Sequence, residues 1–231
     1  MKTLSERIET RFAARSIEPT KELVSYASSC DSYAQGMISH AEMQNAMCNY
    51  LDASSLRVRA LSEALNRLKE PAMSEVVTEA VNMFVDSVIR TDARLFSTFY
   101  TSSEKNVRLS VGSRKPDISI WKGDKLISII ECKTCLGRRR KEWMDDYSSR
   151  VEEFSTIGLD PESMFLFVAT DNTWGGFPKN DSRFEKVWFS LCPVGTWYGG
   201  GKAGEVKLIC KQHEGALEKI SKKLIEVLSK A

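Results

Sequence analysis

The segment from residue 117 to residue 132 reads DISIWKGDKLISIIEC and limits what this chain can fold into. It contains two runs rich in β-branched and aromatic residues, DISIW and LISIIEC, which favour β-strands. Gly123 and Asp124 lie between these runs and form a turn signal. The sequence therefore predicts an antiparallel hairpin whose strands are apolar enough to belong to a covered sheet.

The segments around this hairpin predict a mixed sheet with helices on it. RLFSTFY and NVRLSV are strand candidates before it, and SMFLFVAT, KVWFSLC and EVKLIC are strand candidates after it. SMFLFVAT is apolar throughout, as expected of a strand that is covered on both faces. Helices are expected from Arg139 to Thr156 and from Glu214 to Lys230. This order of elements predicts an α/β fold with a mixed β-sheet core flanked by helices.

The first 70 residues predict a helical N-terminal extension. Apolar residues recur at helical spacing in TKELVSYASSC and in SLRVRALSEALNRLKE. Pro71 then interrupts the pattern, and Ser74 is the expected N-cap of a helix that runs to Arg90. The polar side of that helix carries four residues close to one line: Glu75, Glu79, Asn82 and Asp86. We therefore expect a helical N-terminal region over residues 1–70 and a core over residues 71–231.

Composition narrows the functional class. The 231-residue chain has a formal net charge of +2, so no overall field indicates a nucleic-acid partner, although basic residues can cluster locally. No apolar run approaches membrane-spanning length, and MKTLSERIETRF lacks the apolar core of a signal peptide. Six cysteines in a chain of this length indicate reduced thiols. We therefore expect a cytoplasmic protein with no membrane partner.

Three charged residues stand at the open end of the predicted hairpin. Glu131 and Lys133 are two residues apart, so both project from one face of their strand. A strict two-residue turn would pair Asp117 with Ile130, which puts Asp117 on the other face. A three-residue loop from Gly123 to Lys125, or a β-bulge, would pair Asp117 with Glu131, with β-carbons about 5 Å apart. We predict one of these two arrangements because the chemistry of the three residues requires it.

Two carboxylates this close repel each other unless a cation lies between them. Mg²⁺ suits such a pair, because it takes few carboxylate ligands, keeps several waters and accepts phosphate oxygens from a substrate. It supports phosphoryl chemistry by lowering the pKa of a bound water and neutralising developing charge. Lys133 would orient or help deprotonate that water, or stabilise the charged transition state. There are alternatives to this chemistry. Asp117 could simply be a turn residue after Pro116. Glu131 and Lys133 could be a solvated pair at the end of a strand.

Pro116 and Asp117, followed after thirteen residues by Glu131, Cys132 and Lys133, resemble the PD-(D/E)XK signature of the restriction-endonuclease-like nucleases. The resemblance covers roughly residues 75–170 and includes the hairpin and the apolar approach LISII. It implies a restriction-endonuclease-like fold and hydrolysis of phosphodiester bonds in double-stranded DNA with Mg²⁺, for which Mn²⁺ can substitute. It further implies a bacterial or phage type II restriction enzyme that acts as a homodimer, because two sites are needed to cut two strands.

The resemblance also implies roles for individual residues. Asp117 and Glu131 would be metal ligands, and the main-chain carbonyl of Cys132 would be a further ligand. Lys133 would be the catalytic lysine. Less specific members of the same class, acting in defence or repair, are the nearest alternative function. A different alternative is a DNA-binding or regulatory module that kept the fold and does no chemistry.

Many members of this family carry one more acidic residue on a helix that precedes the sheet. Glu79 is the first candidate for this catalytic position, and Glu75 is the next. The sequence does not choose between them. The alternative for Glu79 is that a polar line on an amphipathic helix is simply its solvated face.

A basic run follows the strand that carries Glu131. Arg138, Arg139, Arg140 and Lys141 lie at the expected start of a helix, where cations oppose the helix dipole. This arrangement makes sense if the phosphate backbone of DNA docks at that end, where free N–H groups also point outward. A solvated run of charge fits the sequence equally well. We take the four residues as candidate DNA-binding residues.

Cys132 and Cys135 form a C-x-x-C pair, which raises zinc or thiol–disulfide chemistry as a third reading. A zinc site needs about four ligands, and the other cysteines and the two histidines are scattered along the chain. Cys132 is expected to point into the core. The sequence therefore favours a buried structural thiol over a redox centre.

Overall fold

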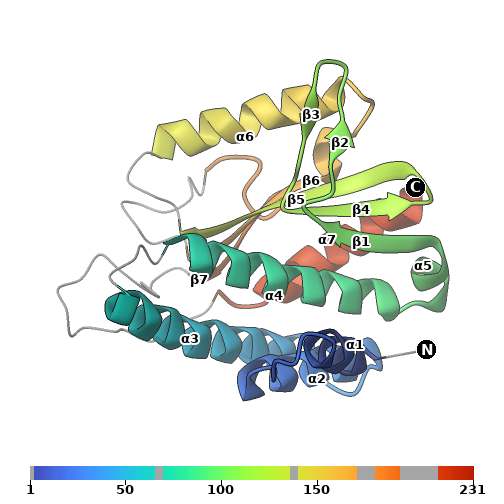
Figure 1. The fold of residues 1–231 in the computed structure, drawn as a ribbon. Coiled ribbons are helices and arrows are strands. Elements are labelled where there is room, and N and C mark those ends of the chain that lie inside the picture. The colour runs from blue at the N-terminus through green and yellow to red at the C-terminus, as the bar shows by residue number, and fades with distance from the viewer. Residues whose placement is uncertain (1–2, 66–69, 136–139, 171–179, 193–212) are drawn as a thin grey trace.

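A five-stranded mixed sheet lies at the centre of the computed structural model (Figure 1), which describes residues 3–65, 70–135, 140–170, 180–192 and 213–231. The strand order is β1-β4-β5-β6-β7. The strands are β1 (Phe99–Ser103), β4 (Ile118–Lys122), β5 (Lys125–Cys135), β6 (Met164–Thr170) and β7 (Trp188–Cys192). β1, β4 and β5 are antiparallel neighbours, whereas β5, β6 and β7 run parallel. The predicted mixed sheet in an α/β fold is confirmed.

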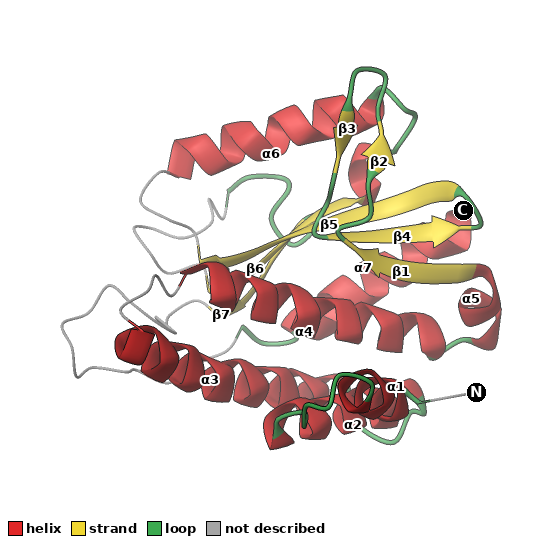
Figure 2. Cartoon of the chain, viewed as in Figure 1, coloured by secondary structure: helices red, strands yellow, loops and turns green. Residues whose placement is uncertain are grey.

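Helices cover both faces of this sheet (Figure 2). α4 (Glu70–Arg90) and α7 (Ala216–Lys230) lie on one face. α6 (Arg140–Ser155) lies on the other face, on the same side as the small hairpin of β2 (Val107–Arg108) and β3 (Ser113–Arg114). A short helix, α5 (Ala93–Thr98), leads into β1, and a 3₁₀ turn, η1 (Pro161–Ser163), leads into β6. In the described residues, no helix is both long enough and apolar enough to cross a membrane.

The N-terminal residues form a helical layer, as predicted, and this layer shares its core with the sheet. α1 (Leu4–Ala13), α2 (Lys21–Ala34) and α3 (His40–Leu65) pack beyond α4 and α7 (Figure 1). One continuous cluster of buried side chains runs from these helices through α4 into the sheet and α7, and includes Tyr26, Met43, Phe84, Ile118, Phe165 and Leu224. The described N-terminal residues, 3–65, are therefore part of the same packed unit as the rest of the described chain.

Asp31 on α2 ties three helices of this unit together. Its carboxylate accepts hydrogen bonds from the main-chain N–H groups of Leu4 at 2.8 Å and Ser5 at 2.9 Å, and from the guanidinium of Arg90 at 2.8 Å. The first turn of a helix has N–H groups without partners in that helix, and Asp31 satisfies two of them in α1. Burial raises the pKa of Asp31, but these hydrogen bonds outweigh it and hold the pKa below its ordinary value.

The start of α4 differs from the prediction. The helix begins at Glu70, and Ser74 lies inside it instead of capping it. Pro71 lies inside the described helix, so the chain is not interrupted between the proline and the rest of α4.

The strand expected in RLFSTFY also begins later than its composition indicates. Its first part is helix α5, and strand β1 starts only at Phe99. Asp92 caps α5 by accepting a hydrogen bond from the main-chain N–H of Arg94 at 2.7 Å, and this local cap outweighs the β-favouring side chains. The strand expected in EVKLIC lies outside the described residues.

Candidate active site

The β4–β5 hairpin contains a β-bulge that fixes the position of its open end. Lys122 pairs with Lys125 across a two-residue turn, in which Gly123 has the positive φ of 57° that such a turn requires. The register then shifts between Ile120 and Trp121. The predicted bulge is confirmed, and the three-residue loop offered as its alternative is not what the chain forms.

The bulge brings Asp117 beside Glu131. Ile118 pairs with Ile130, so Asp117, which directly precedes β4, lies next to Glu131 if the register continues by one position, and its charge acts on Glu131. The main-chain N–H of Cys132 donates a hydrogen bond to Oδ2 of Asp117 at 2.7 Å. This bond fastens the Asp117 carboxylate to β5, at the point where β4 begins.

Alternation along β5 separates the charged groups from the core. Cys132 points toward α4, where its thiol lies near Thr78 and in the main core. Glu131 and Lys133 point to the opposite face, which α6 covers. Lys133 is exposed, whereas Glu131 is buried. The strand therefore presents a buried carboxylate and an accessible ammonium group side by side.

Glu131 is the electrostatic centre of this arrangement. Burial and the negative charge of Asp117 raise its pKa to about 7, and the positive charges of Arg150 and Lys133 act in the opposite direction. Arg150 on α6 forms an ion pair with Glu131. The site thus brings two carboxylates and two cations together from β4, β5 and α6.

This donor set fits a hard divalent cation. Two neighbouring carboxylates repel each other, and this repulsion raises the pKa. A cation that binds both carboxylates offsets the repulsion. The N–H and C=O groups of one strand residue point to the same side of the strand. The N–H of Cys132 points to Asp117, so the carbonyl of Cys132 also points to the side on which Asp117 lies. In the described part of the chain, no three His, Cys, Asp or Glu side chains gather as a metal site. Two carboxylates with waters and a carbonyl are nevertheless a set that Mg²⁺ accepts.

The structure does not bring Glu79 to the two carboxylates. Glu79 lines a hollow of about 280 Å³ between α1 and α4 together with Arg7, and its charge acts on Tyr50 of α3. α4 covers the sheet face opposite to Glu131, and its polar line turns toward the N-terminal helices. Glu75, the second candidate, is exposed. Among the described residues, no third acidic side chain joins Asp117 and Glu131 in a group that could hold a metal ion.

The candidate DNA-binding residues can be located only in part. Arg138 and Arg139 lie outside the described residues. Arg140 and Lys141 lie in the first described turn of α6, and their side chains are not among those described. The basic run consequently stays a prediction from the sequence.

The C-x-x-C pair does not have the environment of a redox centre at Cys132. Cys132 is 1% exposed. Burial, followed by the charges of Asp117 and Glu131, raises its pKa well above the ordinary value, which disfavours the nucleophilic thiolate. The side chain of Cys135 lies outside the described set. The burial of Cys132 agrees with the structural thiol favoured by the sequence.

Sequence reasoning missed Arg150. It follows Tyr147 by three residues and precedes Phe154 by four, so helical spacing places it beside two residues of the apolar side of α6. A cation next to the apolar side of a helix either extends its charged end to solvent or reaches a buried anion. The identity of that anion depends on how α6 lies on β5, which the sequence pattern does not contain.

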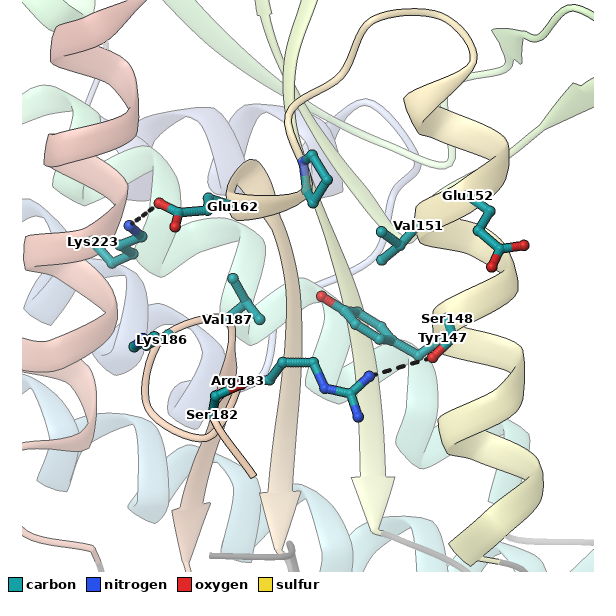
Figure 3. A pocket seen from close by; sticks show the side chains of 11 residues that line it. Tyr147, Ser148, Val151, Glu152, Glu162, Ser182, Arg183, Lys186, Val187 and Lys223 are labelled. Atoms are coloured by element: carbon teal, nitrogen blue, oxygen red, sulfur yellow. Dashed lines mark hydrogen bonds and ion pairs between the residues drawn. The ribbon is translucent and has the colours of Figure 1, made fainter. Parts of the chain in front are cut away.

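A hollow of about 370 Å³ lies beside the same stretch of α6 that carries Arg150, and Tyr147, Ser148, Val151 and Glu152 of that helix line it (Figure 3). Arg183 reaches across it to Ser148 at 3.3 Å and is also held by Asp181 through contacts of 2.8 and 2.9 Å. On its far side, Lys223 bonds to Glu162 at 3.1 Å. Because these two cations already have partners, we do not assign the predicted chemistry to this hollow.

The comparisons with known proteins add no family and no fold relative. Searches of protein-family models, of curated proteins and of solved structures found no significant match to this chain. The case for a function therefore depends on the residues of the site itself.

Proposed function

We propose that this protein is a Mg²⁺-dependent endonuclease that hydrolyses phosphodiester bonds in double-stranded DNA. The observation that carries the proposal is the bulge that brings Asp117 beside Glu131, with Lys133 on the same face of β5. The same residues carry the resemblance to the PD-(D/E)XK nucleases. A mixed sheet with helices on both faces is compatible with the fold that this resemblance implies.

Each residue of the site has a role in this proposal. Asp117, Glu131 and the carbonyl of Cys132 would hold Mg²⁺, or Mn²⁺ in its place. When bound, the ion would lower the pKa of a water and neutralise charge on the scissile phosphate. The N–H of Cys132 keeps the Asp117 carboxylate in position. Lys133 is accessible to solvent and orients the attacking water or stabilises the charge that develops on the phosphate.

The finer identity that we propose is a bacterial or phage type II restriction enzyme that works in the cytoplasm as a homodimer. One chain supplies one pair of metal-binding carboxylates, and a double-strand cut needs two such sites, which a symmetric dimer provides. Arg138, Arg139, Arg140 and Lys141 would contact the DNA backbone, because guanidinium and ammonium groups neutralise phosphates without reading sequence.

Incubation with supercoiled plasmid DNA tests the proposal. With Mg²⁺ the protein should convert the plasmid to open or linear products, and an excess of EDTA should stop the conversion. Discrete fragments would support a restriction enzyme, and a smear would support a less specific nuclease. Retarded migration of uncut plasmid in the presence of Mg²⁺ would contradict the proposal and favour a DNA-binding module without activity.

A further inference from the structure

The guanidinium of Arg150 occupies a position next to the Glu131 carboxylate that a bound metal ion would also occupy. Its guanidinium forms an ion pair with Glu131, whose side chain is 5% exposed, while its own side chain is 38% exposed. The arginine therefore stands between the buried carboxylate and solvent. Because arginine does not lose its proton in proteins, the guanidinium of Arg150 places a permanent positive charge beside the two carboxylates.

The acidic residue one turn along α6 from Arg150 already has another partner. Glu153 lies one turn further along α6, and its charge and that of Arg150 influence each other. However, Arg114 of β3 holds Glu153 through two hydrogen bonds of 2.6 and 2.7 Å. Within the described residues, the ion pair with Glu131 is the one that Arg150 forms.

The site is close to electrical balance without a metal when Glu131 is ionised. Asp117 and Glu131 then contribute two negative charges, and Lys133 and Arg150 contribute two positive charges. A divalent cation would compete with the guanidinium for the same Glu131 oxygens, and two cations at contact distance repel each other strongly in a partly buried site. The exposed part of Arg150 gives the guanidinium a route into solvent when the ion arrives.

We propose that Arg150 is an internal counter-ion that a divalent cation displaces from Glu131, so that this residue sets the metal concentration at which the site loads. The inference rests on the proposed function, because it takes Asp117 and Glu131 as the metal ligands. Arg150 is a positioning residue in this scheme. It holds the Glu131 carboxylate turned toward α6 until the metal takes its place.

Mn²⁺ binding to the DNA-free protein, measured by titration calorimetry, tests this exchange. About pH 8 is suitable, because protons then compete least with the metal for Glu131. Arg150→Gln should bind Mn²⁺ at least about fivefold more tightly than the wild type, the lower end of typical coupling between two binding events. Arg150→Met keeps the apolar stem and carries the same expectation if the Gln variant does not fold.

Two matched variants separate the exchange from a general loss of positive charge. Arg150→Lys keeps the charge and should bind Mn²⁺ nearly as the wild type does. Arg114→Gln removes a guanidinium from the same face, but its partner is Glu153, so the Mn²⁺ affinity should not change. Circular dichroism should show the same helix content in all variants.

The outcomes also separate this inference from the proposed function. Equal or weaker Mn²⁺ binding by Arg150→Gln would overturn the exchange, and so would an equal gain in Arg114→Gln. Absence of Mn²⁺ binding from every variant would overturn both the metal site and the exchange. Tighter binding by Arg150→Gln in a protein that leaves plasmid DNA uncut would support the exchange and contradict the nuclease.

Discussion

At the scale of single residues, Lys133 is the group whose loss should separate catalysis from binding. It is exposed, and its charge acts on Glu131, yet it lies outside the buried core. Lys133→Ala should reduce plasmid cleavage by at least about 100-fold, the lower range for loss of a positioned acid–base group. DNA affinity and melting temperature should change little.

Lys125→Ala is the matched control for this prediction, because Lys125 is an exposed lysine at the other end of the same strand. This variant should cleave at the wild-type rate. Cleavage by Lys133→Ala at the rate of the control would remove the lysine from the mechanism. Gel-based cleavage rates and fluorescence anisotropy with labelled DNA supply the two readouts.

Glu131 should make the stability of the metal-free protein depend on pH. Its pKa is about 7 in the folded chain against an ordinary value of 4.5. Below pH 4.5 the carboxyl is protonated in both states, so its favourable contribution to folding is fully present. As the pH rises toward and through 7, the folded state must ionise a buried group, and that contribution is lost.

Thermal unfolding in EDTA from about pH 5 to pH 8.5 measures this effect. Glu131→Gln should melt at a temperature that falls less over this range than that of the wild type, since the amide side chain of the variant does not ionise. The difference between the two proteins isolates the residue from other titrating groups. A difference in melting temperature that stays constant with pH would contradict the raised pKa.

At the scale of elements, Asp31 should be the main connection that holds α1 to α2 and α4. Asp31→Ala leaves two main-chain N–H groups without their acceptor and leaves Arg90 with its longer ion pair to Asp86 at 3.7 Å, and should lower the free energy of unfolding by about 3–5 kcal/mol. Asp145→Ala, at an exposed position on α6, should change it by less than about 0.5 kcal/mol. Urea unfolding measures both values, and equal stabilities would contradict this role.

The hairpin was the element that the sequence predicted best, for a reason that combines local pattern with chemistry. Alternating β-favouring residues and Gly123 specify two strands and a tight turn. The pattern alone left the register open. The need to bring Asp117 and Glu131 together pointed to a loop or a bulge, and the chain forms the bulge.

Elements were mispredicted where a short-range signal or a distant contact decides the outcome. The cap at Asp92 turns the beginning of an apparent strand into α5. The polar line that includes Glu79 looks like an active-site candidate or a solvated face, but α1 packs beside it. Neither Glu79 nor Arg150 could be placed from periodicity, because each position depends on which helix lies next to it.

At the scale of the whole molecule, the sheet provides two differently used faces. The face under α4 and α7 is continuous with the core of the N-terminal helices, so it serves stability. The face under α6 carries a smaller apolar cluster, which includes Ile129 and Phe154, and beyond it the charged site. A nearly neutral chain of this kind has no global attraction for DNA, so affinity must come from local clusters such as the basic run at the start of α6.

The central claim is that Asp117 and Glu131 hold one divalent cation between them. A crystal structure of the protein with Mn²⁺, phased or checked by anomalous scattering from manganese, tests it most directly. We expect one anomalous peak with an oxygen from each carboxylate about 2.0–2.2 Å away, and with Arg150 no longer in contact with Glu131. A manganese-containing crystal in which the Asp117 and Glu131 carboxylates bind no ion would contradict the claim.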